Sequence, residues 1–241
     1  MTDLVVITGA SSGLGLALAR SVPFPAVVVD ISRSGPPEDS GVAHFPADLS
    51  DPDDWVAVGD ELRRLIVESD PRRAVLIHAA GTLTPIGFAG EVDSASYTSN
   101  VLLNSAAGQV LGHHFLASLA GREGSHDLVI ISSGAASSVY AGWSSYGAGK
   151  AALDQWVRTV GAEQDKRGGV RVSAIAPGVV ATAMQAEIRS VAEQDFPEVD
   201  RFHDLHEQGD LVDPDVAARR IWTAIEAGIE TGSVIDIRRL S

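Results

Sequence analysis

A tyrosine and a lysine four residues apart are the side chains best suited to chemistry in this 241-residue sequence. Tyr146 and Lys150 form a Y-x-x-x-K pair, which on a helix directs both side chains to one face. An unperturbed tyrosine has a pKa of about 10, and a neighbouring ammonium lowers that pKa by stabilising the phenolate. The pair therefore predicts a proton donor for the alkoxide that develops when a carbonyl is reduced. Such pairs are also common on solvated helices, so the pair alone is a weak signal.

A serine upstream of the pair supports the same chemistry. Ser133 lies 13 residues before Tyr146, at the end of an apolar run, where a hydroxyl can bind the substrate oxygen and stabilise its developing charge. Ser132 is the rival for this role, and the spacing favours Ser133.

A glycine-rich segment near the N-terminus predicts a phosphate-binding turn. The segment from Thr8 to Gly15 reads T-G-A-S-S-G-L-G and lies between an expected strand and an expected helix. Three glycines permit a tight turn and let the backbone approach a pyrophosphate, which then sits at the positive N-terminus of the helix. The spacing is G-x-x-x-G-x-G and not the commoner G-x-G-x-x-G, but its place at the first strand–helix junction favours a dinucleotide site.

Short β-branched runs alternate with helical patterns along the whole chain, which is typical of βαβ units. We find no internal repeat and no linker. The sequence therefore predicts an α/β fold, a single-domain doubly wound (Rossmann-type) sheet over residues 1–241, with parallel strands and helices on both faces. Strands are expected at residues 4–8, 26–31, 42–45, 74–78, 128–132, 170–175 and 233–237, and helices from the glycine turn to about 22, from 51, over 96–119, over 144–164 and from 213.

Composition excludes several classes of function. The net charge of −14, from 18 basic and 32 acidic residues, argues against nucleic acid as a partner. No cysteine is present, so disulfides, zinc–thiolate sites and thiol nucleophiles are excluded. We expect no metal site, because His203, His206 and Glu207 share a helical turn without further convergent ligands. Without a signal sequence or a long apolar window, we expect a cytoplasmic protein with no membrane partner.

Taken in order, these motifs resemble those of the short-chain dehydrogenase/reductase family over essentially the whole chain. Three segments are most similar to its benzil reductase and sepiapterin reductase branch: G-W-x-x-Y at 142–146, A-P-G-V-V-x-T-x-M-Q-A at 176–186 and D-R-F at 200–202. The resemblance implies four catalytic residues, in which Asn104 anchors a water that relays protons to Lys150. Asn100, one helical turn earlier, is the rival of Asn104. The implied catalytic set is Asn104, Ser133, Tyr146 and Lys150.

The resemblance also implies a nicotinamide cofactor. Ser32 followed by Arg33 resembles the pair that favours NADP(H), because an arginine can bind the 2′-phosphate. Asp30 lies two residues before Ser32 on the same side of the strand, so a one-residue slip would favour NAD(H), which stays the alternative. His78 stands where most members have an asparagine that braces two strands, and it could donate the same hydrogen bond. The implied cofactor contacts are Gly9, Ser11, Ser12, Gly13, Leu14, Gly15, Ser32, Arg33, Asp48, Leu49, Ala80, Gly81, Tyr146, Lys150, Pro177, Gly178, Val180 and Thr182.

For the substrate, the resemblance implies a lid at about 183–212 and an aromatic pocket in which Trp143 and Tyr140 would contact a flat ligand. Asp236 resembles the carboxylate with which sepiapterin reductases anchor a pterin. The implied substrate contacts are Ser133, Trp143, Tyr146, Met184 and Asp236. We therefore expect NADPH-dependent reduction of a ketone of a small apolar molecule, an aromatic 1,2-diketone such as benzil.

Three alternatives remain open: a sepiapterin-type pterin ketone reductase, an NAD-dependent alcohol dehydrogenase, and a non-catalytic dinucleotide-binding scaffold. The resemblance further implies a homodimer or homotetramer, formed through the helices at 96–119 and 144–164.

Overall fold

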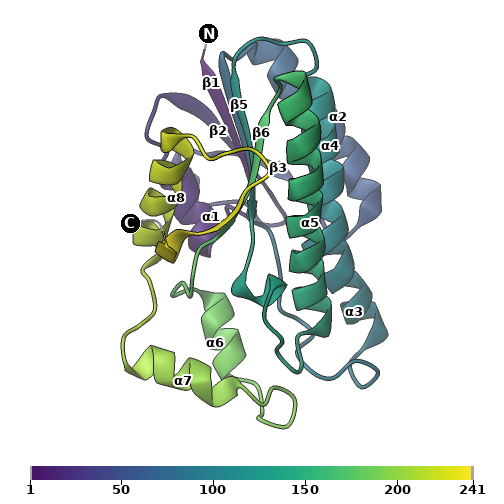
Figure 1. The fold of residues 1–241 in the computed structure, drawn as a ribbon, viewed down its shortest axis with the longest axis vertical. Helices are drawn as coiled ribbons and strands as arrows, with labels where there is room; N and C mark the ends of the chain where they lie inside the picture. Colours follow the sequence, from purple (N-terminus) through teal and green to yellow (C-terminus); the bar gives the residue numbers. More distant parts are fainter. Residues whose placement is uncertain (1, 240–241) are drawn as a thin grey trace.

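The computed structural model describes residues 2–239 and is built around one seven-stranded sheet. Its strand order is β3-β2-β1-β4-β5-β6-β7, and each neighbouring pair is parallel. Helices pack on both faces, so the predicted doubly wound arrangement is confirmed (Figure 1). The strands are β1 (Asp3–Thr8), β2 (Ala26–Ser32), β3 (Ala43–Pro46), β4 (Arg73–His78), β5 (Ser125–Ile131), β6 (Arg171–Ala176) and β7 (Val234–Asp236).

Two apolar cores flank the sheet, and the first strand shows why. Leu4 and Val6 of β1 face one core, whereas Val5 and Ile7 face the other, because successive side chains of a strand point to opposite sides. A strand buried on both faces is therefore a continuous apolar run and not an alternating one.

The helices divide between these two cores (Figure 1). The first core packs beneath α2, α4 and α5, and the second beneath α1 and α8. Helices α6 and α7 lie apart from both layers, beyond one end of the sheet. No helix within residues 2–239 is long and apolar enough to cross a membrane. The helix bounds are α1 (Gly13–Arg20), α2 (Pro52–Ser69), α3 (Ser94–Val101), α4 (Gly108–Ser118), α5 (Ser144–Arg167), α6 (Ala183–Arg189), α7 (Val199–Glu207) and α8 (Pro214–Ala227).

Local sequence signals fix several helix ends. Asp51 caps α2 by accepting a hydrogen bond from the Asp53 amide, and Asp213 caps α8 in the same way. In both helices a proline follows the cap, where the missing amide proton costs nothing. Helix α5 ends at Gly168, whose φ of 64° is the left-handed conformation that glycine adopts without strain.

The segment predicted as one α-helix over 96–119 is not uniform. Helices α3 and α4 are joined by a π-helical stretch, η2 (Leu102–Ala107), so the prediction of a regular helix is wrong there. Within this stretch the Asn104 side chain forms hydrogen bonds with the backbone of Thr82. At Gly108, the first residue of α4, an added Cβ would lie 2.9 Å from the ring of His78. These contacts come from distant parts of the chain, so the periodicity of the segment does not reveal them. Strand β5 begins three residues before the predicted start at Leu128, and the other predicted strand edges lie within one residue of the structure.

The topology creates a crevice at the carboxyl ends of β1 and β4. The chain runs outward from β1 through β2 to β3, then returns to β4 on the other side of β1. Connections after β1 and β4 therefore leave in opposite directions, which is where doubly wound sheets bind their ligands.

Candidate active site

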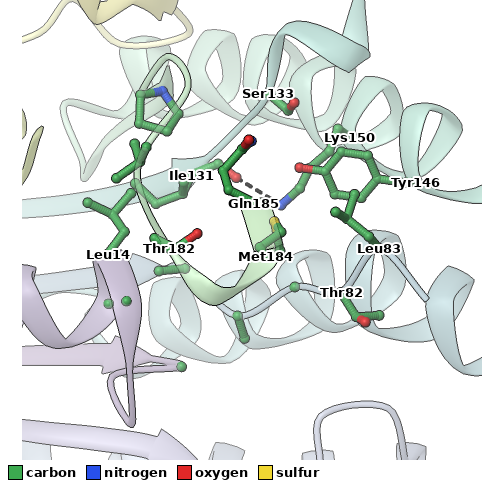
Figure 2. Close-up of a pocket in the computed structure, with 18 of the residues that line it drawn as sticks. Leu14, Thr82, Leu83, Ile131, Ser133, Tyr146, Lys150, Thr182, Met184 and Gln185 are labelled. Atoms are coloured by element: carbon green, nitrogen blue, oxygen red, sulfur yellow. Dashed lines mark hydrogen bonds between the residues drawn. The ribbon is translucent and has the colours of Figure 1, made fainter. Parts of the chain in front are cut away.

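A cavity of about 580 Å³ lies at this crevice, and most of the predicted site residues line it (Figure 2). Of the residues predicted to contact cofactor or substrate or to act in catalysis, Asn104 and Asp236 are the two that do not line it. Those that do are Gly9, Ser11, Ser12, Gly13, Leu14, Gly15, Ser32, Arg33, Asp48, Leu49, Ala80, Gly81, Ser133, Trp143, Tyr146, Lys150, Pro177, Gly178, Val180, Thr182 and Met184.

The three glycines of the turn after β1 stand at positions that do not suit a side chain. Gly9 and Gly13 have φ angles of 74° and 54°, which favour glycine. At Gly15 an added Cβ would lie 2.2 Å from the carbonyl oxygen of Gly9. The turn delivers the N-terminus of α1 to the cavity, where the first amides of a helix have no partner within the helix. A glycine turn at a helix N-terminus is the arrangement that binds phosphate groups in dinucleotide-binding folds.

The carboxylate of Asp30 is buried behind this turn. Its oxygens accept hydrogen bonds from the Ala10 amide at 2.7 Å, the Ser32 hydroxyl at 2.6 Å and His44 Nδ1 at 2.9 Å. Asp30 has no exposed surface and does not line the cavity. Ser32 and Arg33 do line it, and the Arg33 side chain is 77% exposed with its guanidinium 3.9 Å from Asp48.

His78 braces the two central strands, but as an acceptor. The Thr8 hydroxyl oxygen already accepts hydrogen bonds from the amides of Ala79 and Ala80, so its proton points to His78 Nδ1, 3.0 Å away. Burial lowers the pKa of His78 to about 3, and the nearby charge of Lys150 acts in the same direction. The ring is therefore neutral, and the expectation that His78 donates this hydrogen bond is wrong.

Tyr146 and Lys150 lie one turn apart on α5, and both are buried against the cavity. Lys150 Nζ donates to the carbonyl oxygen of Ile131 at 2.9 Å and lies 5.9 Å from the centre of the Tyr146 ring. Figure 2 shows Ser133, Tyr146 and Lys150 together on one side of the cavity. The Ser133 hydroxyl oxygen accepts a hydrogen bond from the Ala135 amide at 3.2 Å, so the hydroxyl proton is directed to a different partner.

Burial sets the acidity of both α5 groups. Burial raises the pKa of Tyr146, against a smaller opposing effect of a hydrogen bond with Ser133. Burial also lowers the pKa of Lys150 to about 8, opposed by the negative charge of Asp154. The expectation that Lys150 lowers the pKa of Tyr146 is therefore not met, because desolvation of the phenolate dominates. Tyr146 is a protonated phenol at neutral pH.

The two serine candidates differ in their contacts. The Ser132 hydroxyl donates to Asp154 at 2.6 Å, on the side of β5 that faces α5, and both groups are buried. Asp154 lies one turn after Lys150 and was not singled out from the sequence, since a lone aspartate on a helix is usually solvated.

Both asparagine candidates form hydrogen bonds with the segment that follows β4. Asn104 donates to the Thr82 carbonyl at 2.7 Å and to Asn100 Oδ1 at 2.9 Å, and it accepts from the Thr82 amide at 3.2 Å. Asn100 donates to the Thr84 carbonyl at 2.9 Å. Both side chains thus fix the strand-end connection after β4.

The substrate end of the cavity is aromatic. Trp143 stacks on Phe196 with ring centres 4.6 Å apart, and Tyr140 and Phe202 pack around them. Arg201 donates from Nη1 to the Tyr140 hydroxyl at 3.0 Å. Met184 also lines the cavity (Figure 2).

Asp236 does not contact the cavity, although it was predicted as a substrate anchor. Its carboxylate accepts hydrogen bonds from Nε and Nη2 of the Arg238 guanidinium, and Arg238 lines the cavity in its place. The sequence reasoning also missed Gln185 and Leu83, which line the cavity close to Tyr146 (Figure 2). Gln185 could have been found as a polar residue on the buried face of a predicted helix, which it shares with Ile188.

Comparison with known proteins agrees with this geometry. The family model described as short chain dehydrogenase matches residues 3–193. The chain belongs to the short-chain dehydrogenase family. It is an oxidoreductase of that family, and members of the family bind a nicotinamide dinucleotide.

The relatives of this short-chain dehydrogenase fall in the predicted branch. It is 35% identical to a benzil reductase ((S)-benzoin forming) from Bacillus subtilis over 98% of both chains. It is 30% identical to a sepiapterin reductase from Rattus norvegicus, over 96% of this chain and 94% of the relative. Among solved structures, the short-chain dehydrogenase/reductase YIR035C from Saccharomyces cerevisiae superposes with a TM-score of 0.83 at 25% identity, covering 99% of this chain and 97% of that one.

Proposed function

We propose that this short-chain dehydrogenase is an NADPH-dependent carbonyl reductase that reduces one carbonyl of a small, largely apolar ketone. The leading substrate class is an aromatic 1,2-diketone such as benzil. One observation carries the proposal. A buried, protonated Tyr146 lies with Ser133 and Lys150 at a cavity that has an aromatic wall around Trp143. The names of the two Bacillus relatives, both benzil reductases, support this substrate class.

The cavity fits a nicotinamide dinucleotide. The glycine turn leaves space for a pyrophosphate at the amides of Gly13 and Leu14. At the other end, Val180 and Thr182 would hold the nicotinamide carboxamide, and Lys150 would hold the ribose beside it. Ser32, Arg33, Asp48 and Leu49 would surround the adenosine, and Ala80 and Gly81 would pack against it.

The contacts of Asp30 favour NADP(H) over NAD(H). An NAD-type carboxylate must reach the ribose hydroxyls, but Asp30 is buried and already accepts three hydrogen bonds. Arg33 is exposed at the cavity rim, where its guanidinium is available to a 2′-phosphate.

When bound, the reduced nicotinamide would supply the hydride that the carbonyl carbon of the substrate accepts. Ser133 donates its hydroxyl proton to the carbonyl oxygen as a hydrogen bond and stabilises the charge that develops there. Tyr146 transfers its phenol proton to that oxygen, so that C=O becomes CH–OH. The Lys150 ammonium then stabilises the tyrosinate until a proton returns, through a water that Asn104 anchors.

The segment at 183–212 would act as a lid over the substrate. Its aromatic side chains Phe196 and Phe202 pack on Trp143, and Glu187 accepts a hydrogen bond from Thr84 across the cavity mouth. A pterin ketone is the second substrate class, and the pairing of Asp236 with Arg238 gives it no support. We also propose a homodimer or homotetramer through the α3–α4 and α5 helices.

Initial rates of NADPH oxidation with benzil and with sepiapterin test the proposal, in the wild type and in Tyr146→Phe. We expect turnover of benzil that falls at least about a thousandfold in the variant, because the phenol is the proton donor. If the wild type reduces neither benzil nor sepiapterin, or if Tyr146→Phe leaves the rate unchanged, the enzyme assignment would be overturned in favour of a binding scaffold. Equal or faster turnover with NADH would overturn the role of Arg33.

A further inference from the structure

A buried carboxamide without a partner faces the cavity. Gln185 lies on α6, and its side chain is 8% exposed. Its Oε1 is fully buried without a hydrogen-bond partner, and no group in the part of the chain described here bonds its Nε2. The buried Oε1 is an acceptor and cannot bond a ligand carbonyl, so the group of Gln185 that can bind a ligand oxygen is the Nε2 amide.

The position of Gln185 places its carboxamide in the part of the cavity where we expect the substrate to bind. Figure 2 shows its side chain extending into the space between Thr182 on one side and Ser133 and Tyr146 on the other. The surrounding wall contributes mainly apolar side chains: Leu83, Trp143, Met184 and Ile188. Once Ser133 and Tyr146 bind the reacting carbonyl, the Gln185 amide is a polar group of this wall that can bond a second polar atom of the substrate and avoid the cost of burying that atom unpaired.

We propose that Gln185 binds the second, unreacted carbonyl of a 1,2-dicarbonyl substrate. This inference rests on the proposed function, which assigns the reacting carbonyl to Ser133 and Tyr146. The two oxygens of a vicinal dicarbonyl are separated by two carbons, so both can be bound at once from facing walls. The Gln185 amide donates a hydrogen bond to the second oxygen, and a monoketone has no second oxygen to accept that hydrogen bond.

Holding the second carbonyl also limits the extent of reduction. One hydride and one proton convert the first carbonyl to CH–OH, and the other oxygen stays bonded to Gln185, away from Tyr146. To be reduced again, the hydroxyketone would have to exchange the places of its two oxygens. The geometry thus assigns to Gln185 both selection of dicarbonyls and release of the product as a hydroxyketone.

Binding to the oxidised complex tests this proposal without turnover. The dissociation constants of benzil and of the monoketone in which one benzil carbonyl is a methylene are measured for the NADP⁺ complex, which has no hydride to transfer. In the wild type we expect benzil to bind about tenfold more tightly, as one neutral hydrogen bond in a dry site provides. In Gln185→Met, which keeps the length but removes the amide, the two constants should become equal. Gln185→Glu, with no N–H, should also lose the preference.

Trp143→Phe is the matched control, since Trp143 Nε1 is a buried donor of the cavity wall without a hydrogen-bond partner. It should weaken both ligands alike and keep the preference for benzil. The inference is overturned if the wild type binds both ligands equally, if Gln185→Met keeps the preference, or if Trp143→Phe abolishes it. It is also overturned if Gln185→Met weakens NADP⁺ instead. A preference for benzil that depends on Gln185, without any reduction by NADPH, would reject the proposed function alone.

Discussion

Loss of the positive charge on Lys150 should end carbonyl reduction as the pH rises through about 8. The group is buried, and burial lowers its pKa from the ordinary lysine range to about 8. The amine is then about 90% protonated at pH 7 and about 10% at pH 9. Tyr146 moves in the opposite direction, because burial raises its pKa and keeps the phenol protonated over this range.

The rate should follow the ammonium. If the charged Lys150 is the active form, kcat/KM for ketone reduction should be nearly constant from pH 6 to 7. It should then fall by about tenfold per pH unit well above pH 8, with the slope of a single proton. A Lys150→Arg variant keeps its charge at all these values, so any activity it retains should not show this decline.

The composition of the chain allows this pKa to be measured directly. The sequence contains two lysines, Lys150 and Lys166, and Lys166 is exposed near the end of α5. Protein labelled with ¹³C or ¹⁵N at the lysine side chain should therefore give two NMR signals, and Lys166→Arg should leave one. Titration of that signal reports Lys150 alone. A value above about 10, or reduction that is undiminished at pH 9, would refute the reasoning.

Three further predictions follow from contacts near this group and in the cofactor cradle. Asp154→Asn removes the negative charge that raises the pKa of Lys150, so both the NMR titration and the alkaline decline of the rate should move to lower pH; no movement would contradict the coupling. Arg33→Ala should raise the dissociation constant of NADPH by about 10- to 100-fold and leave that of NADH within about twofold, as measured by fluorescence titration, whereas equal losses would argue against a 2′-phosphate contact. Gly15→Ala places a Cβ within 2.2 Å of the Gly9 carbonyl oxygen, so binding of both dinucleotides should be lost and Tm should fall in a thermal melt; retained NADPH affinity would show that the turn can widen.

Much of the fold follows from the sequence for a simple physical reason. The strands of a sheet buried on both faces are short apolar runs, and the turn after β1 needs glycines because backbone atoms fill the space of a side chain. The Asp-Pro pairs marked the starts of α2 and α8. Each of these signals depends on only a few neighbouring residues, so it can be recognised in the sequence.

What the sequence did not reveal depends on contacts between distant segments. The π-helical turn at η2 accompanies the bonds of Asn104 to Thr82, 22 residues away. The direction of the Tyr146 pKa depends on how deeply α5 is buried, and spacing alone suggested the wrong sign. Gln185 could be read as an ordinary helix residue until the cavity placed it among apolar walls.

The bonds of Asp30 have a consequence for protein engineering. The same carboxylate accepts hydrogen bonds from the Ala10 amide of the glycine turn and from the Ser32 hydroxyl at the end of β2. A redesign of coenzyme preference that replaces Asp30 or Ser32 should therefore also loosen the glycine turn that we propose to bind the diphosphate. Designers should expect altered selectivity and weaker overall affinity to arrive together, unless Asp30 and its partner His44 are kept.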